Sequence, residues 1–247
     1  FAVLTSLDRE PLATRNAVTT APSLRTFARA YRNDGARRGS SAALFAAAPL
    51  PGGNLPPLPQ SVSEVAIASR SYADATIERH ATRAQFLARS GSCAVVHFAG
   101  HVVVHAERPL FSALVFENGE LLYAHELDGR SFAKARLVVL SGCDSGRTPR
   151  PTMSVANALL SQSVPSVVYT LWPVGDDVAE AFSIALHRAI AAGHTRADAV
   201  RVAQLALKQK WPNDVEAWAA FALAGAPGAL EVETKGERLW TGIRSIR

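Results

Sequence analysis

A histidine and a cysteine follow two apolar segments of the sequence at matching positions. The segment 94–99 leads through a glycine to His101, and the segment 137–141 leads through a glycine to Cys143. Both segments are short, continuous and rich in β-branched residues, which is typical of parallel strands that are covered on both faces. Reactive groups of an open parallel sheet gather at the carboxyl ends of its strands. We therefore expect the two side chains to lie close together if the two strands are neighbours.

A histidine beside a cysteine is an arrangement suited to nucleophilic catalysis. A thiol with a pKa of about 8.5 is mostly protonated at neutral pH, so a nearby imidazole is what makes it reactive. His101 would serve as general base and acid, Cys143 as nucleophile, and the glycines beside them would leave backbone amides free to stabilise an oxyanion. The other interpretation is that Cys143 is a small buried residue and His101 an ordinary loop histidine. Spacing alone leaves both interpretations open.

Strand patterns alternate with helix patterns around these two residues, which predicts one α/β domain with a mostly parallel sheet flanked by helices. We predict further strands over 42–48, 73–78 and 167–172, and helices over 23–31, from 61, and over 82–89, 153–163, 176–192 and 195–208. Thr82 is expected to cap one helix, and Thr195 with Asp198 to form a capping box at another. The Pro-rich segment 49–59 must be an exposed loop. A local hairpin over 114–123 has a two-residue Asn-Gly turn, and everything after residue 176 is predicted helical.

Composition narrows the class of protein. Of the 247 residues 48% are apolar, enough for a real core, but no apolar run approaches the roughly 20 residues that cross a bilayer. Two cysteines are too few for a disulfide framework or a structural zinc site, which favours a reducing cytoplasm. The net charge of +5 is local: residues 1–60 hold seven Arg against three acids. That segment has no recognition-helix pattern, so nucleic acid is not an expected partner.

Other features of the sequence carry less chemistry. No glycine-rich phosphate-binding motif occurs, and the histidines have no metal-ligand spacing, so we assign no nucleotide and no metal. Cys93 begins an apolar strand and is expected to be buried in the core. The sequence opens at Phe1 without a leader pattern, so we expect further sequence on its amino-terminal side.

Three ordered segments resemble the motifs of CHAT domains, which are caspase-like modules named for their association with TPR repeats. The segments are His97-Phe-Ala-Gly-His101, Leu137-Val-Val-Leu-Ser-Gly-Cys-Asp-Ser-Gly146 and Val164-Pro-Ser-Val-Val-Tyr-Thr-Leu-Trp-Pro-Val-Gly-Asp176. The segments 21–24, 197–206 and 218–225 and the Pro-rich loop are similar to the same family. The resemblance covers about residues 20–225 of a chain that we interpret as a single domain over 1–247.

The resemblance implies a caspase-like three-layer sandwich, cysteine peptidase activity, no cofactor, and a parent protein with amino-terminal TPR repeats or another sensor. The catalytic histidine of the family falls on His101 and its nucleophile on Cys143. The amides of Cys143 and Val102 would form the oxyanion hole. Family members have Gly where Val102 stands, and a β-branched residue restricts the backbone there. The first histidine of the motif is His97, which we interpret as structural.

Three acids could set substrate preference. Asp144 follows the presumed nucleophile, and the pair Asp176 and Asp177 follows a segment similar to the separase stretch whose acid contacts the basic residue before the cut. A carboxylate at the pocket floor would favour Arg there. The alternative is that Asp176 caps the helix over 176–192, and one residue can do both.

Three functions remain in competition. The first is a cysteine endopeptidase that cleaves after Arg, in a bacterial defence or cell-death pathway, with a gasdermin-like pore former among the substrates that the resemblance suggests. The second is a catalytically silent scaffold that binds partners, for which Val102 is the one indication. The third is another thiol-dependent hydrolase or acyltransferase. If Arg is preferred, self-cleavage at Arg147 or Arg150 is conceivable, because both lie in a loop after Cys143.

Overall fold

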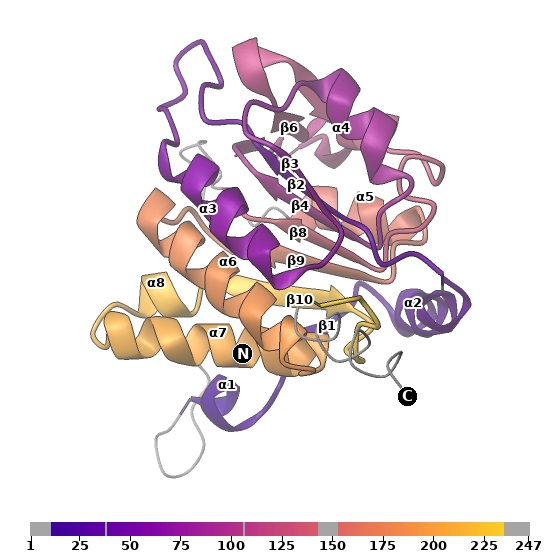
Figure 1. The fold of residues 1–247 in the computed structure, drawn as a ribbon, viewed down its shortest axis with the longest axis vertical. Helices are drawn as coiled ribbons and strands as arrows, with labels where there is room; N and C mark the ends of the chain where they lie inside the picture. The colour runs from indigo at the N-terminus through magenta and orange to yellow at the C-terminus, as the bar shows by residue number, and fades with distance from the viewer. Residues whose placement is uncertain (1–10, 38, 106, 143–152, 235–247) are drawn as a thin grey trace, which may run out of the picture.

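The computed structural model describes residues 11–37, 39–105, 107–142 and 153–234. A central sheet lies between two layers of helices (Figure 1). In spatial order, the strands of this sheet are β1 (Thr19–Thr20), β10 (Phe221–Gly225), β9 (Ser166–Thr170), β8 (Leu137–Leu140), β4 (Val95–Ala99), β2 (Ala43–Ala47) and β3 (Ala75–Glu78). Neighbouring strands are parallel, except that β10 is antiparallel to β9. The predicted α/β sandwich with a mostly parallel sheet is confirmed.

Helices cover both faces of the sheet. One layer holds α3 (Gln60–Ala68), α6 (Asp176–Ala191) and α7 (Arg196–Lys210), and the other holds α2 (Leu24–Ala36), α4 (Arg83–Ser90) and α5 (Met153–Ser161). The short α1 (Leu12–Arg15) and α8 (Val215–Trp218) lie against α7. Because side chains alternate along a strand, Phe45 belongs to the core under α3 and α6, whereas Leu44 belongs to the core under α4 and α5.

Capping residues begin the helices where the sequence predicts them. The Thr82 side chain accepts a hydrogen bond from the Gln85 N–H, and the Gln85 side chain accepts one from the Thr82 N–H, which forms a capping box at α4. At α7 the Thr195 hydroxyl accepts from the Asp198 N–H. The Asp198 carboxylate binds that hydroxyl instead of the Thr195 N–H. The predicted capping box is therefore only half formed.

The predicted hairpin is part of a second, smaller antiparallel sheet of β5 (Val102–Val103), β6 (Ala113–Val115) and β7 (Leu121–Tyr123). Its turn is longer than the two residues predicted. The Phe116 N–H donates to the Glu120 carbonyl, so that residues 117–119 form the loop. The Asn118 N–H donates to the Leu50 carbonyl at 3.2 Å. The neighbouring loop therefore fixes this turn, which local sequence does not reveal.

Strand β10 corrects the prediction that the chain is helical after residue 176. Its alternation of Phe, Leu and small residues is too short to distinguish a strand from a buried helical turn. In the fold β10 pairs with β9 on one side and with the two-residue β1 on the other. The Gln204 amide also donates to the Phe221 carbonyl at 2.8 Å, which ties α7 to the edge of the sheet.

A buried ion cluster joins α2 to the start of β8 and to α7. The Asp34 carboxylate accepts from the Arg136 Nε at 3.0 Å and from Arg196, whose side chain is fully buried. Burial raises the pKa of Asp34, but the bonds to Arg196 and Arg136 outweigh it and hold this pKa below its ordinary value. Removing one partner of such a pair leaves a buried charge uncompensated.

We therefore expect Asp34→Ala to lower the free energy of unfolding by about 3 to 5 kcal/mol at neutral pH. Because the folded-state pKa is depressed, the carboxylate contributes stability above the unfolded pKa of about 3.9, and this is lost as the pH falls through the folded value. Urea unfolding at pH 7 and at pH 3 measures the effect. The difference between wild type and variant should shrink in acid, and an unchanged difference would contradict the assignment.

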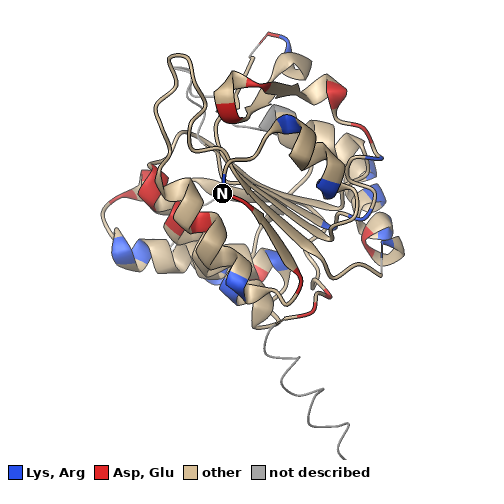
Figure 2. Cartoon of the chain, turned by 45° about the horizontal axis from the view of Figure 1, so that its top comes forward, with Lys and Arg blue, Asp and Glu red and all other residues tan. Residues whose placement is uncertain are grey.

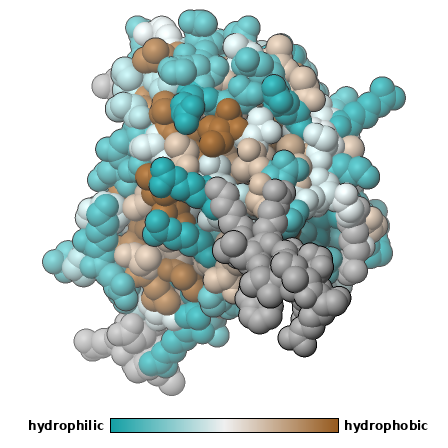
Figure 3. All heavy atoms as spheres, viewed as in Figure 1, coloured by the Kyte–Doolittle hydropathy of each residue, from teal (hydrophilic) through white to brown (hydrophobic). Residues whose placement is uncertain are grey.

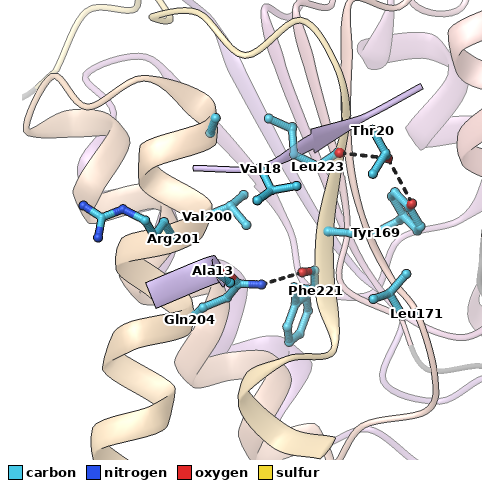
Figure 4. Close-up of a pocket in the computed structure, with 12 residues that line it drawn as sticks. Ala13, Val18, Thr20, Tyr169, Leu171, Val200, Arg201, Gln204, Phe221 and Leu223 are labelled. Atoms are coloured by element: carbon cyan, nitrogen blue, oxygen red, sulfur yellow. Dashed lines mark hydrogen bonds between the residues drawn. The ribbon is translucent and has the colours of Figure 1, made fainter. Parts of the chain in front are cut away.

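The surface of the described residues is mixed. Apolar residues form separate patches among hydrophilic ones on the face seen in Figure 3. A hollow of about 220 Å³ lies at the β1 and β10 edge of the sheet, lined by Val18, Tyr169 and Phe221 among others (Figure 4). Within the described ranges, no helix combines the length and the apolar character that a bilayer crossing requires.

Candidate active site

The two strands that lead to the predicted pair are direct neighbours. β4 and β8 pair in parallel, with Phe98 opposite Leu140, and the Ser141 N–H continues the ladder by donating to the Phe98 carbonyl at 2.9 Å. Beyond this point the two backbones converge, since a Cβ added to Gly142 would lie 2.1 Å from the Gly100 carbonyl oxygen. The predicted adjacency is therefore correct up to Gly142. Cys143 and Asp144 themselves lie outside the described residues, as do Arg147 and Arg150.

His101 is buried at the carboxyl end of β4, with 2% of its surface exposed. Its Nε2 lies 2.8 Å from the Pro56 carbonyl oxygen. A carbonyl can only accept, so this nitrogen carries the proton and donates it. Nδ1 is then unprotonated, and it has no hydrogen-bond partner among the described residues. The ring thus presents a buried, unsatisfied proton acceptor at the edge of the sheet.

The Pro56 carbonyl is a functional group that sequence reasoning missed. The Pro-rich loop was expected only to be exposed, and Pro56 is exposed. The loop closes on itself through a hydrogen bond of 2.9 Å from the Leu58 N–H to the Pro49 carbonyl. Its origin at the end of β2, the strand beside β4, was the one available signal, because loops that leave neighbouring parallel strands share a sheet edge.

Val102, predicted to supply an oxyanion amide, begins β5 and is fully buried. It lies opposite Leu114, and the Val115 N–H donates to the His101 carbonyl at 2.9 Å. This pattern makes Val102 and Leu114 a non-hydrogen-bonded pair, so the Val102 N–H points away from β6. The β-branched side chain thus anchors the strand while its amide stays out of the ladder.

Asp176 is the first residue of α6, but it does not cap that helix. The N-cap of α6 is Gly175, with no side-chain hydrogen bond. The Asp176 Oδ2 instead accepts from the Gln60 N–H at 2.7 Å, at the start of α3, which has no other side-chain cap. The predicted alternative, a cap of its own helix, is wrong. The two helices start at the same edge of the sheet, and packing brings the carboxylate to the free amide of its neighbour.

The acids around Asp176 form a cluster at the start of α3 and α6 (Figure 2). Burial is the largest cause of a raised Asp176 pKa, and Glu64, Glu180 and Asp177 raise it further, against the lowering effect of the Gln60 N–H. Asp177 is exposed at the same helix end. Among the described residues, no lysine or arginine pairs with Asp176 or Asp177. This end of the molecule is therefore locally negative.

Below the edge, a chain of buried polar groups crosses the layer between the sheet and α6. His97 contacts Glu64 at 2.8 Å and His187 at 3.0 Å, and His187 contacts the Tyr72 hydroxyl at 2.7 Å. Burial, and secondarily His97, lowers the pKa of His187 well below its ordinary value, so this ring is neutral. His97 is fully buried within β4 and hydrogen-bonded on both nitrogens. Sequence reasoning missed the other members of this chain.

The sequence matches the family model described as "CHAT domain" over residues 1–226. This chain belongs to the CHAT-domain family. No curated protein matches the CHAT domain at the same standard.

Solved structures with the same fold include the Saccharomyces cerevisiae separase–securin complex at 2.6 Å, with a TM-score of 0.52 and 14% sequence identity over 88% of the CHAT domain. The Arg-specific cysteine proteinase gingipain R has a TM-score of 0.53 and 11% identity over 84% of it. The CHAT domain spans 14% of the separase chain and 52% of the gingipain chain. It therefore has a caspase-like peptidase fold.

The remaining candidate groups of the CHAT domain carry no site. Cys93 is buried in the core as predicted, and burial raises the pKa of its thiol. Among the described residues, no three His, Cys, Asp or Glu side chains come together in a way that could hold a metal ion.

The close approach of Gly142 to Gly100 predicts a steep penalty for any side chain at residue 142. Gly142→Ala should lower the free energy of unfolding of the CHAT domain by about 1 to 3 kcal/mol, because the clash is with backbone and not with a flexible side chain. Gly35→Ala is the matched control, since Gly35 lies inside α2 with nothing within 4 Å of the added atom. Chemical unfolding of both variants measures the difference, and equal stabilities would contradict the packing described.

Proposed function

We propose that this CHAT domain is a cysteine endopeptidase in which Cys143 is the nucleophile and His101 the general base and acid. The observation that carries the proposal is the His101 ring, whose protonated Nε2 is held by the Pro56 carbonyl and whose buried Nδ1 is free to accept a proton. Cys143 is covalently joined to Gly142, which packs on Gly100, the residue before His101. Consecutive Cα atoms are 3.8 Å apart, so the thiol is tethered near this ring.

The proposed reaction has two steps. The Cys143 thiol gives its proton to Nδ1 of His101 as the sulfur attacks the carbonyl carbon of the scissile bond. The tetrahedral oxyanion is stabilised by the N–H groups of Val102 and Cys143, the C–N bond breaks, and the amine leaves with the proton from His101. In the second step, His101 takes a proton from water, the hydroxide displaces the thioester, and the carboxylic acid and free thiol are regenerated.

We propose that the bond cleaved follows an arginine. The negative cluster at the start of α6 supports this, because Asp176 and Asp177 have no arginine or lysine partner in the described part of the chain. A guanidinium offers paired hydrogen bonds to a carboxylate, whereas an ammonium offers a point charge. Asp144, which is next to the nucleophile in sequence, is a further proposed contact. Gingipain R, with the same fold, is an Arg-specific cysteine proteinase.

The wider setting is also a proposal. The substrate would be a cytoplasmic protein, such as a gasdermin-like pore former, in a bacterial defence or cell-death pathway, and TPR repeats or another sensor would control the domain. Cleavage after Arg147 or Arg150 would be a self-processing event. A catalytically silent scaffold is the second candidate, supported by Val102 in place of the family glycine.

Digestion of a peptide library by wild type and by Cys143→Ala, read by mass spectrometry, tests the proposal. We expect new peptide ends after arginine with wild type and none with the variant. Cleavage by both proteins would assign the activity to another group. No cleavage by either would favour the scaffold, and cleavage after other residues would remove the arginine assignment while keeping the nucleophile.

A further inference from the structure

Helix α3 is held to the rest of the domain by side chains at several levels along its length. Figure 1 shows α3 beside α6 over one face of the sheet. Asp176 accepts from the Gln60 N–H at its first residue, and the Ser63 hydroxyl donates to the Glu180 carboxylate at its first turn. Glu64 reaches through the same layer to His97 on β4 at 2.8 Å. The loop that carries Pro56 thus runs directly into a helix with fixed height and rotation.

Strand β4 meets this loop and helix twice. His97 binds Glu64 on α3, and His101, four residues further along, binds the Pro56 carbonyl at 2.8 Å. Four extended residues span about 13 Å, so the two contacts lie at well-separated heights along one segment of chain. The other end of the loop is pinned by the Leu58 N–H on the Pro49 carbonyl. The height of α3 therefore sets where the Pro56 carbonyl meets the imidazole.

One arrangement of protons satisfies every contact in the buried chain. The Glu64 carboxylate accepts from Nε2–H of His97, Nδ1 of His97 accepts from Nε2–H of His187, and Nδ1 of neutral His187 accepts from the Tyr72 hydroxyl. All four side chains are fully or almost fully buried. Apolar residues of similar size would often serve stability as well as such a buried polar set. What the set adds is a fixed distance between α3 and β4.

We propose that Glu64 and His97 are positioning residues for His101: their hydrogen bond fixes α3 against β4 and so holds the Pro56 carbonyl that keeps the His101 proton on Nε2. The inference rests on the proposed function for its catalytic meaning, since only a base with a free Nδ1 can take the thiol proton. Neither residue touches the reacting atoms. Both act through the position of the loop.

The experiment compares two changes at Glu64 in the 247-residue chain. Glu64→Gln keeps an oxygen that accepts from His97, whereas Glu64→Met keeps the volume and removes the acceptor. Tyr72→Phe is the matched control, because it removes a buried hydrogen bond from the same chain and leaves the Glu64–His97 contact intact. The ¹⁵N resonances of the His101 ring, identified with His101→Gln, report which nitrogen carries the proton at a pH where the ring is neutral.

Wild type, Glu64→Gln and Tyr72→Phe should show His101 with its proton on Nε2, and Glu64→Met should show both tautomers. Where peptide hydrolysis is measured, Glu64→Met should lower kcat about tenfold to a hundredfold with little change in KM, and Glu64→Gln should restore most of it. A single Nε2–H tautomer in Glu64→Met would overturn the inference. The resonances are independent of turnover, so an inactive wild type would refute the peptidase and leave this test decisive.

His97→Phe provides a second reading if Glu64→Met does not fold. The His97 ring already stacks on Phe45, with centroids 5.4 Å apart, so an aromatic replacement fits the layer while it removes the same bond. Mixed tautomers at His101 would support the inference, and an unchanged Nε2–H tautomer would overturn it.

Discussion

Cys143→Ala is expected to abolish peptide hydrolysis, with a loss on the order of 10⁴-fold or more, while the melting temperature stays nearly unchanged. The side chain supplies the bond to the acyl group, and no other described thiol can replace it because Cys93 is buried in the core. His101→Ala should cause a loss of similar size. The two changes remove parts of one unit, so the double variant should be no worse than Cys143→Ala alone.

Hydrolysis of an arginine-ending fluorogenic peptide, together with thermal unfolding, measures these effects. Cys93→Ala is the control, and it should keep turnover within about twofold of wild type because the thiol faces the core and not the sheet edge. Residual activity in Cys143→Ala would remove the nucleophile assignment. Unfolding of that variant would show that the residue is part of the core.

Asp176→Ala is expected to lower turnover of arginine substrates more than a hundredfold. The change would leave a substrate guanidinium buried without its partner, which costs about 3 to 5 kcal/mol. It also removes the cap of α3, worth about 1 kcal/mol of stability. Asp144→Ala should cost less turnover. Turnover of matched peptides ending in Arg, Asp and Leu measures the preference.

Asp176→Asn separates the two roles of the carboxylate. The amide oxygen of asparagine can still accept from the Gln60 N–H, so the melting temperature should stay near that of wild type, but the charge is gone. Arginine turnover should therefore remain low in this variant. Asp177→Ala, at the exposed neighbour, is the control for a general change in charge. Full arginine activity in Asp176→Asn, or a wild-type preference for Asp or Leu, would reduce Asp176 to a helix cap.

The central strands could be predicted because burial on both faces of a parallel sheet produces short, continuous apolar segments. The adjacency of β4 and β8 then followed from the glycines and polar residues that end both strands at the same edge. Strand β10 escaped prediction because five residues rich in Ala and Leu suit a helix equally well. Its identity comes from pairing with β9, which is distant in sequence.

The missed parts of the site are contacts whose partner cannot be identified from residue type. Every residue has a backbone carbonyl, so nothing in the Pro-rich loop singles out the one at Pro56 as the acceptor for His101. Asp176 was recognised as a possible cap, but the choice between its own helix and α3 depends on how two helices pack. Glu64 resembles a surface residue of a helix until the fold places it beside His97.

Covalent trapping of the nucleophile tests the central claim most directly. A peptidyl acyloxymethyl ketone ending in arginine alkylates an activated thiolate, and intact-mass and peptide-map analysis locates the adduct. We predict one equivalent on Cys143, none in Cys143→Ala, and much slower labelling in His101→Ala, whose thiol lacks its base. No adduct in wild type, or labelling of Cys143 at the same rate without His101, would contradict the proposed His101 and Cys143 pair.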